Sequence, residues 1–204
     1  MKSLNNWLLV LSVLSCFGCS SPVHEDDRGC AFVSDSIQYR VEFMSAGCVR
    51  ILSFPEGDTL VTRRLVVDSE KPAFKDYKWE DTGQKLLFRT RELSVVFDKA
   101  DVAFTFQETS TGKLLLKEKG DRKARNFKRS VAGGEQCLEV TQRFVPTEDE
   151  AIYGLGQYQN GIMNYRGKSV LLLQANMDIV NPFLISTNGY GVLWDNYSST
   201  KFED

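Results

Sequence analysis

Amide, carboxylate and aromatic side chains are concentrated in one part of this chain, residues 157–178. Sugars present hydroxyl groups along their edges and weakly apolar C–H faces, so sugar-binding sites combine amide or carboxylate groups with aromatic platforms. The segment therefore predicts a carbohydrate-binding site, although amides are also common in ordinary loops and that alternative stays open. The side chains that could take part are Gln157, Tyr158, Gln159, Asn160, Asn164, Tyr165, Gln174, Asn176 and Asp178.

Paired carboxylates are the other chemistry that the chain could support, since a glycosidase needs two carboxylates placed a few ångströms apart. The candidates besides Asp178 are Asp195, Asp204 and the adjacent acids Glu148, Asp149 and Glu150. Three consecutive acids before an apolar strand are typical of a solvated loop, and we expect this of residues 148–150. Asp195 ends a predicted strand, where it could cap a turn as well as bind a ligand. Asp178 is the strongest candidate, and its alternative role is to stabilise its own loop.

The shortage of histidine excludes most hydrolase chemistries. The one histidine, His24, precedes the predicted domain. A Ser-His-Asp or Cys-His mechanism therefore has no base in that domain, and a His-rich metal site has no ligands. The segment Gly154-Leu155-Gly156 lacks the third glycine of a dinucleotide-binding loop, because that position holds Gln159. We expect neither a metal nor a cofactor.

The cysteines of the predicted domain are Cys30, Cys48 and Cys137. Their scattered spacing does not match a zinc site. We expect them to be small buried residues, although an exported protein could join two of them in a disulfide.

The overall charge argues against a nucleic-acid partner, because the formal net charge of the 204 residues is −2. Residues 113–129 are locally basic, but acidic residues interrupt them and Phe127 is their one aromatic platform. We expect a solvated hairpin and loop there. Contact with an acidic surface or partner domain is the alternative.

The N-terminus predicts export. Residues 1–19 contain a lysine, an apolar run over residues 7–14 that is too short to span a bilayer, and two cysteines. This layout indicates a bacterial lipoprotein signal, with Cys16 favoured over Cys19 as the lipidated residue; a plain secretory signal is the alternative. Residues 20–29 predict a flexible tether, and residues 30–204 the folded domain. We expect an exported protein whose lipid alone contacts the membrane, on the periplasmic or surface face of the outer membrane.

Alternation of apolar and polar side chains predicts a domain built of strands. Ile37, Tyr39, Val41 and Phe43 are apolar and the residues between them are polar, a period of two that marks a strand with one buried face. No window of the domain has a convincing helical period, so we expect an all-β, antiparallel β-sandwich. The further predicted strands are CVRILSF, LVTRRLVV, KLLFRT, ELSVVFD, VAFTFQE, KLLLKE, CLEVTQRFV, SVLLLQA, PFLIST and GYGVLWD.

Two stretches, YGLGQYQNG at residues 153–161 and QANMDIVNPFLISTNGYGVLWDN at residues 174–196, resemble a known family. They are similar to the end of the N-terminal β-sandwich of glycoside hydrolase family 31, the α-glucosidases and α-xylosidases. The match rests on a Y-G-L-G-[EQ] segment, an Asn-x-Asp loop, a Pro-Phe strand and a [YH]-G-[VI] strand. Within the family, GQYQNG with QANMD and GYGVLWDNYS looks most like the α-xylosidases that trim xyloglucan-type side chains.

The resemblance implies a sandwich of the galactose-mutarotase-like type, whose loop before the Pro-Phe strand leans over the mouth of a catalytic barrel. By that match Asp178 would hydrogen-bond substrate hydroxyls, Asn176 would shape the loop, and Gln157 would support the loop from behind.

The resemblance also implies a missing partner. In the family, the nucleophilic and acid/base aspartates belong to a (β/α)8 barrel that follows the sandwich and needs about 250 further residues. Nothing in residues 1–204 corresponds to either aspartate, so we expect no catalytic residue here and a non-catalytic domain of an α-glycosidase, truncated or split from its barrel. A free-standing carbohydrate-binding surface lipoprotein and a purely structural interaction domain are the alternatives. An exposed apolar face is expected wherever the barrel would pack.

Overall fold

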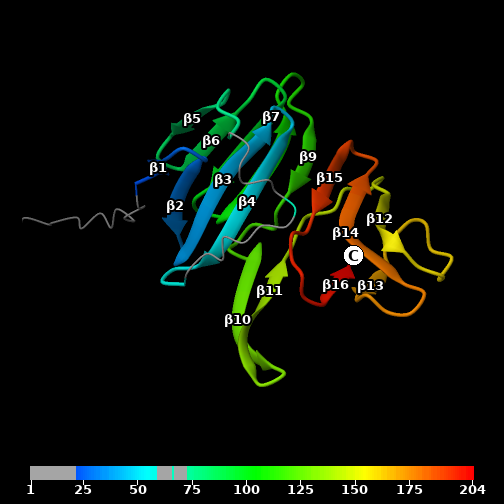
Figure 1. Ribbon diagram of the computed structural model, residues 1–204. Helices are drawn as coiled ribbons and strands as arrows, with labels where there is room; N and C mark the ends of the chain where they lie inside the picture. The colour runs from blue at the N-terminus through cyan, green and yellow to red at the C-terminus, as the bar shows by residue number, and fades with distance from the viewer. Residues whose placement is uncertain (1–21, 59–65, 67–72) are drawn as a thin grey trace, which may run out of the picture.

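Residues 22–58, 66 and 73–204 are described by a computed structural model, and this part of the chain consists of strands and loops without a helix (Figure 1). The strands pair in antiparallel fashion throughout. The predicted all-β, antiparallel fold is therefore confirmed for these residues. Cys16, Cys19 and all of the predicted strand LVTRRLVV except Val66 lie outside the described residues.

Two sheets form the first sandwich. The order of the first is β1-β2-β3-β4, and that of the second is β5-β6-β7-β8-β9. The strands of the first are β1 (His24–Glu25), β2 (Cys30–Ser34), β3 (Ile37–Ser45) and β4 (Cys48–Pro55). Those of the second are β5 (Lys78–Asp81), β6 (Lys85–Arg89), β7 (Leu93–Asp98), β8 (Ala103–Glu108) and β9 (Leu114–Lys117).

The core of this sandwich is aromatic. Tyr39, Phe97 and Phe104 are at most 1% exposed, and the centroids of the Phe97 and Phe104 rings lie 4.8 Å apart. The Arg125 guanidinium lies 5.3 Å from the centroids of the Tyr39 and Phe104 rings and forms a buried ion pair with Glu118. Part of the basic stretch is therefore buried against the core, where we expected a solvated loop throughout.

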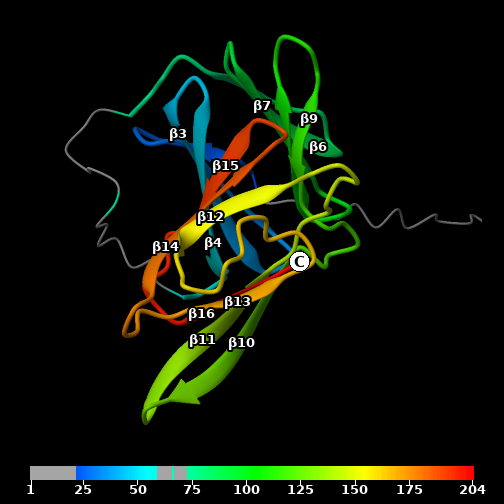
Figure 2. The same ribbon diagram turned by 90° about the vertical axis from the view of Figure 1, so that its right-hand side faces the viewer.

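A hairpin and a second packed unit complete the fold. Strands β10 (Arg125–Ala132) and β11 (Glu135–Gln142) form a hairpin that projects from the body in both views (Figures 1 and 2). Strands β12 (Ile152–Gln157), β14 (Ile179–Ser186) and β15 (Tyr190–Leu193) form a three-stranded sheet. Strands β13 (Ser169–Leu172) and β16 (Thr200–Glu203) form a two-stranded sheet. A small core made by Ile152, Leu155, Tyr165 and Leu172 joins these two sheets.

The predicted tether is wrong for its second half. His24 and Glu25 pair with β2, and the Glu25 carboxylate accepts hydrogen bonds from the Trp79 indole (2.8 Å) and the Tyr77 hydroxyl (3.0 Å). Asp26 is ion-paired with Arg40. The polar composition of this segment suggested a flexible chain. Its carboxylates instead accept hydrogen bonds from Tyr77, Trp79 and Arg40, which hold the segment against the sandwich.

The cysteines divide into two groups. Cys30 is buried as expected, but Cys48 and Cys137 are exposed, and all three are free thiols. The expectation of buried cysteines is therefore wrong for Cys48 and Cys137.

Candidate functional site

A tight loop that joins β13 to β14 carries Asn176 and Asp178. The Gln174 amide closes this loop: its Nε2 donates to the Asp178 carbonyl oxygen (2.7 Å), and its Oε1 accepts from the Val180 N–H (3.1 Å). The Asp178 N–H donates to the Ala175 carbonyl (3.3 Å), and Met177 at the apex has a φ of 69°. The loop is thus held by its own first side chain.

The glycines of the YGLGQ segment explain how Gln157 reaches this loop. Gly156 has a φ of 119°, and a Cβ there would lie 2.8 Å from the Asn181 nitrogen and closer still to the Ile179 carbonyl. Only glycine lets β12 and β14 approach this closely. The register shifts between Gly154 and Gly156, and Leu155 between them is 3% exposed. Gln157 then pairs with Ile179, the residue after Asp178.

The three predicted site residues are therefore brought to one end of the β12-β14-β15 sheet. Gln157 and Asn176 are exposed and Asp178 is half-buried. Within the part of the chain that the structure describes, none of these three side chains forms a hydrogen bond. Their polar groups point to a site that can accept a ligand without first breaking internal bonds.

The resemblance implied that Gln157 supports the loop, but the side chain that does so is Gln174. The main chain of Gln157 pairs with β14, whereas the side-chain hydrogen bonds to the loop come from Gln174. The spacing of Gln174 four residues before Asp178 was the one signal in the sequence that could have indicated this role.

Tyr158, the aromatic residue that follows Gln157, is partly buried. Burial raises the pKa of the Tyr158 phenol, and the negative charge of Asp178 is one of the further contributions. The Tyr158 hydroxyl donates to the Leu155 carbonyl (3.1 Å), so the ring is fixed. The ring packs against the small core around Leu155 and Tyr165, so its contacts are those of a structural residue.

Three other amide or aromatic side chains of residues 157–178 have structural contacts, whereas Gln159 is exposed. Asn164 Oδ1 accepts from the Ile152 and Arg166 N–H groups, each at 3.1 Å. Asn160 Oδ1 accepts from the Ile162 N–H (2.9 Å), and Tyr165 is buried. The composition of the segment thus overstated the number of side chains available to a ligand.

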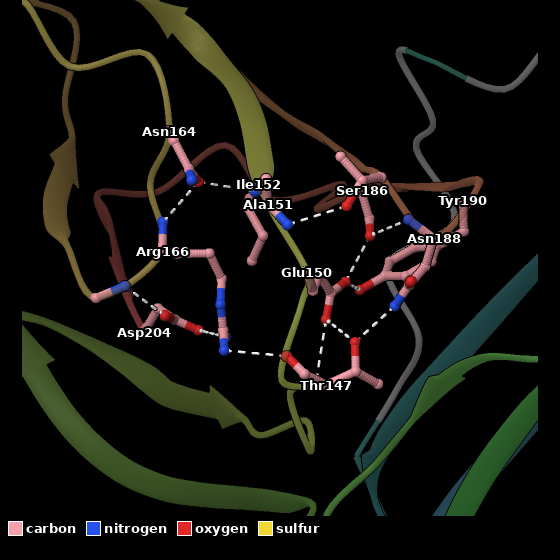
Figure 3. Close-up of polar contacts among 12 residues, drawn as sticks. Thr147, Glu150, Ala151, Ile152, Asn164, Arg166, Ser186, Asn188, Tyr190 and Asp204 are labelled. Atoms are coloured by element: carbon pink, nitrogen blue, oxygen red, sulfur yellow. Dashed lines mark hydrogen bonds and ion pairs between the residues drawn. The ribbon is translucent and has the colours of Figure 1, made fainter.

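Glu150 is the centre of a buried polar network, which Figure 3 shows. Its carboxylate accepts hydrogen bonds from Ser186 Oγ (2.6 Å), the Tyr190 hydroxyl, and the N–H and hydroxyl of Thr147 (3.2 Å each). Burial raises the pKa of Glu150, but these hydrogen bonds outweigh burial and hold the pKa below its usual value. The expectation of a solvated Glu150 is therefore wrong, because distant strands supply its donors.

The remaining candidate acids are also tied into the structure. Asp204 Oδ1 accepts from Arg166 Nη1 (2.6 Å), beside the same network in Figure 3. Asp195 Oδ2 accepts from Arg50 Nη2 of β4 (2.9 Å), and its Oδ1 accepts from the Tyr197 hydroxyl (3.1 Å). Both acids therefore join segments that are distant in the sequence.

Two cavities, of about 290 and 710 Å³, border the first sandwich, and neither is lined by Gln157, Asn176 or Asp178. The candidate site lies outside both of these cavities. Among residues 22–58, 66 and 73–204, no cluster of His, Cys, Asp and Glu is arranged to hold a metal ion. In the same residues no helix has the length and apolar content needed to cross a membrane.

Comparison with known proteins connects this geometry to one family. Residues 38–203 match the family model described as the glycosyl hydrolase 31 N-terminal galactose mutarotase-like domain. An α-xylosidase of Saccharolobus solfataricus is 34% identical over 178 residues, which are 80% of this chain and 23% of that protein.

Solved structures agree. The family 31 α-xylosidase of Xanthomonas citri is 32% identical with a TM-score of 0.77, over 88% of this chain and 19% of that one. A soil-metagenome family 31 α-xylosidase complexed with xylose is 25% identical with a TM-score of 0.70, over 90% of this chain and 29% of that one. This chain thus spans less than a third of the length of each of these relatives.

Proposed function

We propose that this chain serves as the non-catalytic domain of an α-glycosidase. The premise is that the chain belongs to the family of N-terminal galactose mutarotase-like domains of glycosyl hydrolase 31. The substrate class is α-linked xylosyl or glucosyl oligosaccharides of plant type, and we favour an α-xylosidase because the three relatives described above carry that name. The domain contributes the loop of residues 174–178 to a carbohydrate-binding cleft.

The observation that supports this role is the free polar surface at the end of the β12-β14-β15 sheet. Asp178 supplies two acceptor oxygens, and Asn176 and Gln157 each supply an acceptor and donors. Gln174 fixes the loop that carries Asp178 and Asn176, so little conformational freedom is lost when a sugar binds. We assign direct contact with sugar hydroxyls to Asp178 and a flanking role to Asn176 and Gln157.

Bond cleavage is assigned to a partner. Retaining hydrolysis needs two carboxylates on opposite sides of the scissile bond, and here Asp195, Asp204 and Glu150 already serve structural contacts. In the proposal the two catalytic aspartates belong to a (β/α)8 barrel, and the barrel and this loop together enclose the sugar. The proposal includes export and lipid anchoring through Cys16, or alternatively Cys19, both within the predicted N-terminal signal.

A free-standing carbohydrate-binding lipoprotein is the second candidate. The observation that favours it is the exposure of Gln157 and Asn176, which are accessible without any partner. The two candidates differ in affinity, because a complete binding site must hold its sugar alone, whereas one wall of a cleft holds it weakly.

Affinity electrophoresis in gels containing xyloglucan tests the proposal. We expect the wild-type chain to be weakly retarded, with a dissociation constant in the millimolar range. Asp178→Asn should abolish retardation. The matched control is Asp149→Asn, which makes the same charge change at an exposed acid outside the loop and should leave the retardation unchanged.

Two results would decide against this assignment. Equal retardation of wild type and Asp178→Asn would remove Asp178 from the site. Retardation at micromolar xyloglucan concentration would establish the free-standing binding protein in place of the cleft wall.

A further inference from the structure

The larger of the two cavities lies at one end of the first sandwich and is lined by both of its sheets. Its volume is about 710 Å³. Asp35 comes from the β2–β3 turn of one sheet, and Gln84 and Lys99 come from the β5–β6 and β7–β8 turns of the other. We call this space the end cavity. Pockets of this size are typical of sites that hold small molecules.

The inner wall of the end cavity is apolar. Phe32, Leu86 and Phe97 line it, and these side chains are at most 6% exposed. All three belong to the core of the sandwich, where the centroids of the Phe32 and Phe97 rings lie 4.8 Å apart. The cavity therefore ends on the packed core, and a ligand would enter and leave by the same mouth.

The two cations of the cavity wall already have counter-charges. Arg122 Nη1 donates to Asp35 Oδ1 (2.8 Å), which joins the β9–β10 connection to the β2–β3 turn. Lys99 Nζ donates to Asp81 Oδ1 (2.7 Å). Because both positive charges are paired, the wall does not favour an anion such as phosphate.

Two other polar side chains of the wall have no internal partner. Among the residues that the structure describes, neither the Glu56 carboxylate nor the Gln84 side-chain amide forms a hydrogen bond or an ion pair. Glu56 offers two acceptor oxygens, and Gln84 offers an acceptor oxygen and two N–H donors. Hydroxyl groups match this set, since a hydroxyl can both donate and accept.

The backbone holds the mouth of the end cavity in shape. The Ser36 carbonyl accepts from the Glu56 N–H (2.9 Å), and the Gln84 carbonyl accepts from the Lys99 N–H (3.0 Å). Three residues of the wall also have positive φ angles: Asp35 (53°), Ser36 (59°) and Arg122 (58°). Backbone strain of this kind in non-glycine residues is concentrated at ligand and active sites.

We propose that the end cavity binds one free monosaccharide, of the pentose or hexose class that an α-glycosidase releases. A sugar ring has hydroxyls along its edge for Glu56 and Gln84, and C–H faces for the apolar inner wall. A ring within a polysaccharide does not fit, because its chain would have to continue through a cavity with one mouth. The choice of sugar rests on the proposed function, but the site is separate from the loop of residues 174–178.

Nuclear magnetic resonance of the full chain, labelled with ¹⁵N, tests this site with D-xylose as the probe. We expect a saturable shift of the Gln84 side-chain amide signals, with a dissociation constant in the millimolar range. Glu56→Gln should weaken binding by about tenfold, because a hydrogen bond to a charged group is lost. The matched control is Glu135→Gln, the same change at an exposed acid of the β10-β11 hairpin, which should bind D-xylose like wild type.

Three results would overturn the proposal. The first is the absence of a saturable shift with D-xylose, and the second is equal affinity of the Glu56→Gln and Glu135→Gln variants. The third is a shift with inorganic phosphate and none with D-xylose, which would assign the cavity to an anion. Failure of the proposed function is a separate result, because it is measured by retardation in xyloglucan, which Glu56→Gln should leave unchanged.

Discussion

Replacing Gly156 with alanine should displace the candidate sugar loop and destabilise the sheet that carries it. The added Cβ would lie 2.8 Å from the Asn181 nitrogen and closer to the Ile179 carbonyl, whereas ordinary contacts of this kind measure 3.4–4 Å. Strand β14 would have to move by about 1 Å, since both obstructing groups belong to its backbone and cannot rotate away.

The magnitude follows from two contributions. A φ of 119° is unfavourable for alanine by about 1–3 kcal/mol. Separating β12 from β14 weakens main-chain hydrogen bonds of about 1 kcal/mol each. We therefore expect Gly156→Ala to lower the free energy of unfolding by about 3–5 kcal/mol.

Gly161→Ala is the matched control. Gly161 also has a positive φ, of 69°, but a Cβ there meets no atom within 4 Å. Its loss should be about 1 kcal/mol, the conformational contribution alone. Urea denaturation followed by tryptophan fluorescence and circular dichroism measures both variants. Equal losses for the two variants would refute the argument that close approach of the strands requires Gly156.

Three further predictions concern buried and ionised groups. Glu150→Gln should lower the free energy of unfolding by about 2 kcal/mol, because an amide nitrogen would face donors that now bind a carboxylate; an unchanged urea midpoint would contradict this. The Arg40 hydrogen bond, opposed by burial, lowers the pKa of Asp26 to about 2, so its stabilisation is complete above about pH 4 and is lost as the pH falls toward 2. Because the side chain is 37% exposed, we expect this to amount to less than about 1 kcal/mol, and Asp26→Asn should remove that part of the acid dependence of the urea midpoint. Burial raises the pKa of Cys30 to about 11, so mass spectrometry after brief iodoacetamide treatment should show Cys48 and Cys137 alkylated and Cys30 protected; rapid alkylation of Cys30 would contradict its burial.

The strands of the first sandwich could be predicted because their pattern is local. In β3 the alternation of Tyr39, Val41 and Phe43 with polar residues is sufficient to assign a strand with one core face. Glu42 shows the limit of this argument, since it belongs to the polar set but is 1% exposed between Arg40 and Arg50. Charge pairing across strands compensates its burial, and the partner on β4 cannot be assigned from β3 alone.

The candidate site was predictable where residue type and turn geometry act together. The YGLGQ and QANMD segments indicated where a polar loop would meet a glycine-rich strand, and Gln157 does pair with Ile179, the residue that follows Asp178. Glu150 could not be assigned from sequence, because Ser186 and Tyr190 bind it from 36 and 40 residues away. An acid in an acidic run looks solvated until the fold supplies its donors.

Contact between sugar and the loop of residues 174–178 can be measured by nuclear magnetic resonance of side-chain amides. The full chain, labelled with ¹⁵N, would be titrated with the disaccharide α-D-xylosyl-(1→6)-D-glucose at millimolar concentrations. We expect shifts of the Asn176 and Gln157 side-chain amide signals that disappear in Asp178→Asn. Unchanged amide signals at these two residues, with shifts confined to the cavities of the first sandwich, would contradict it.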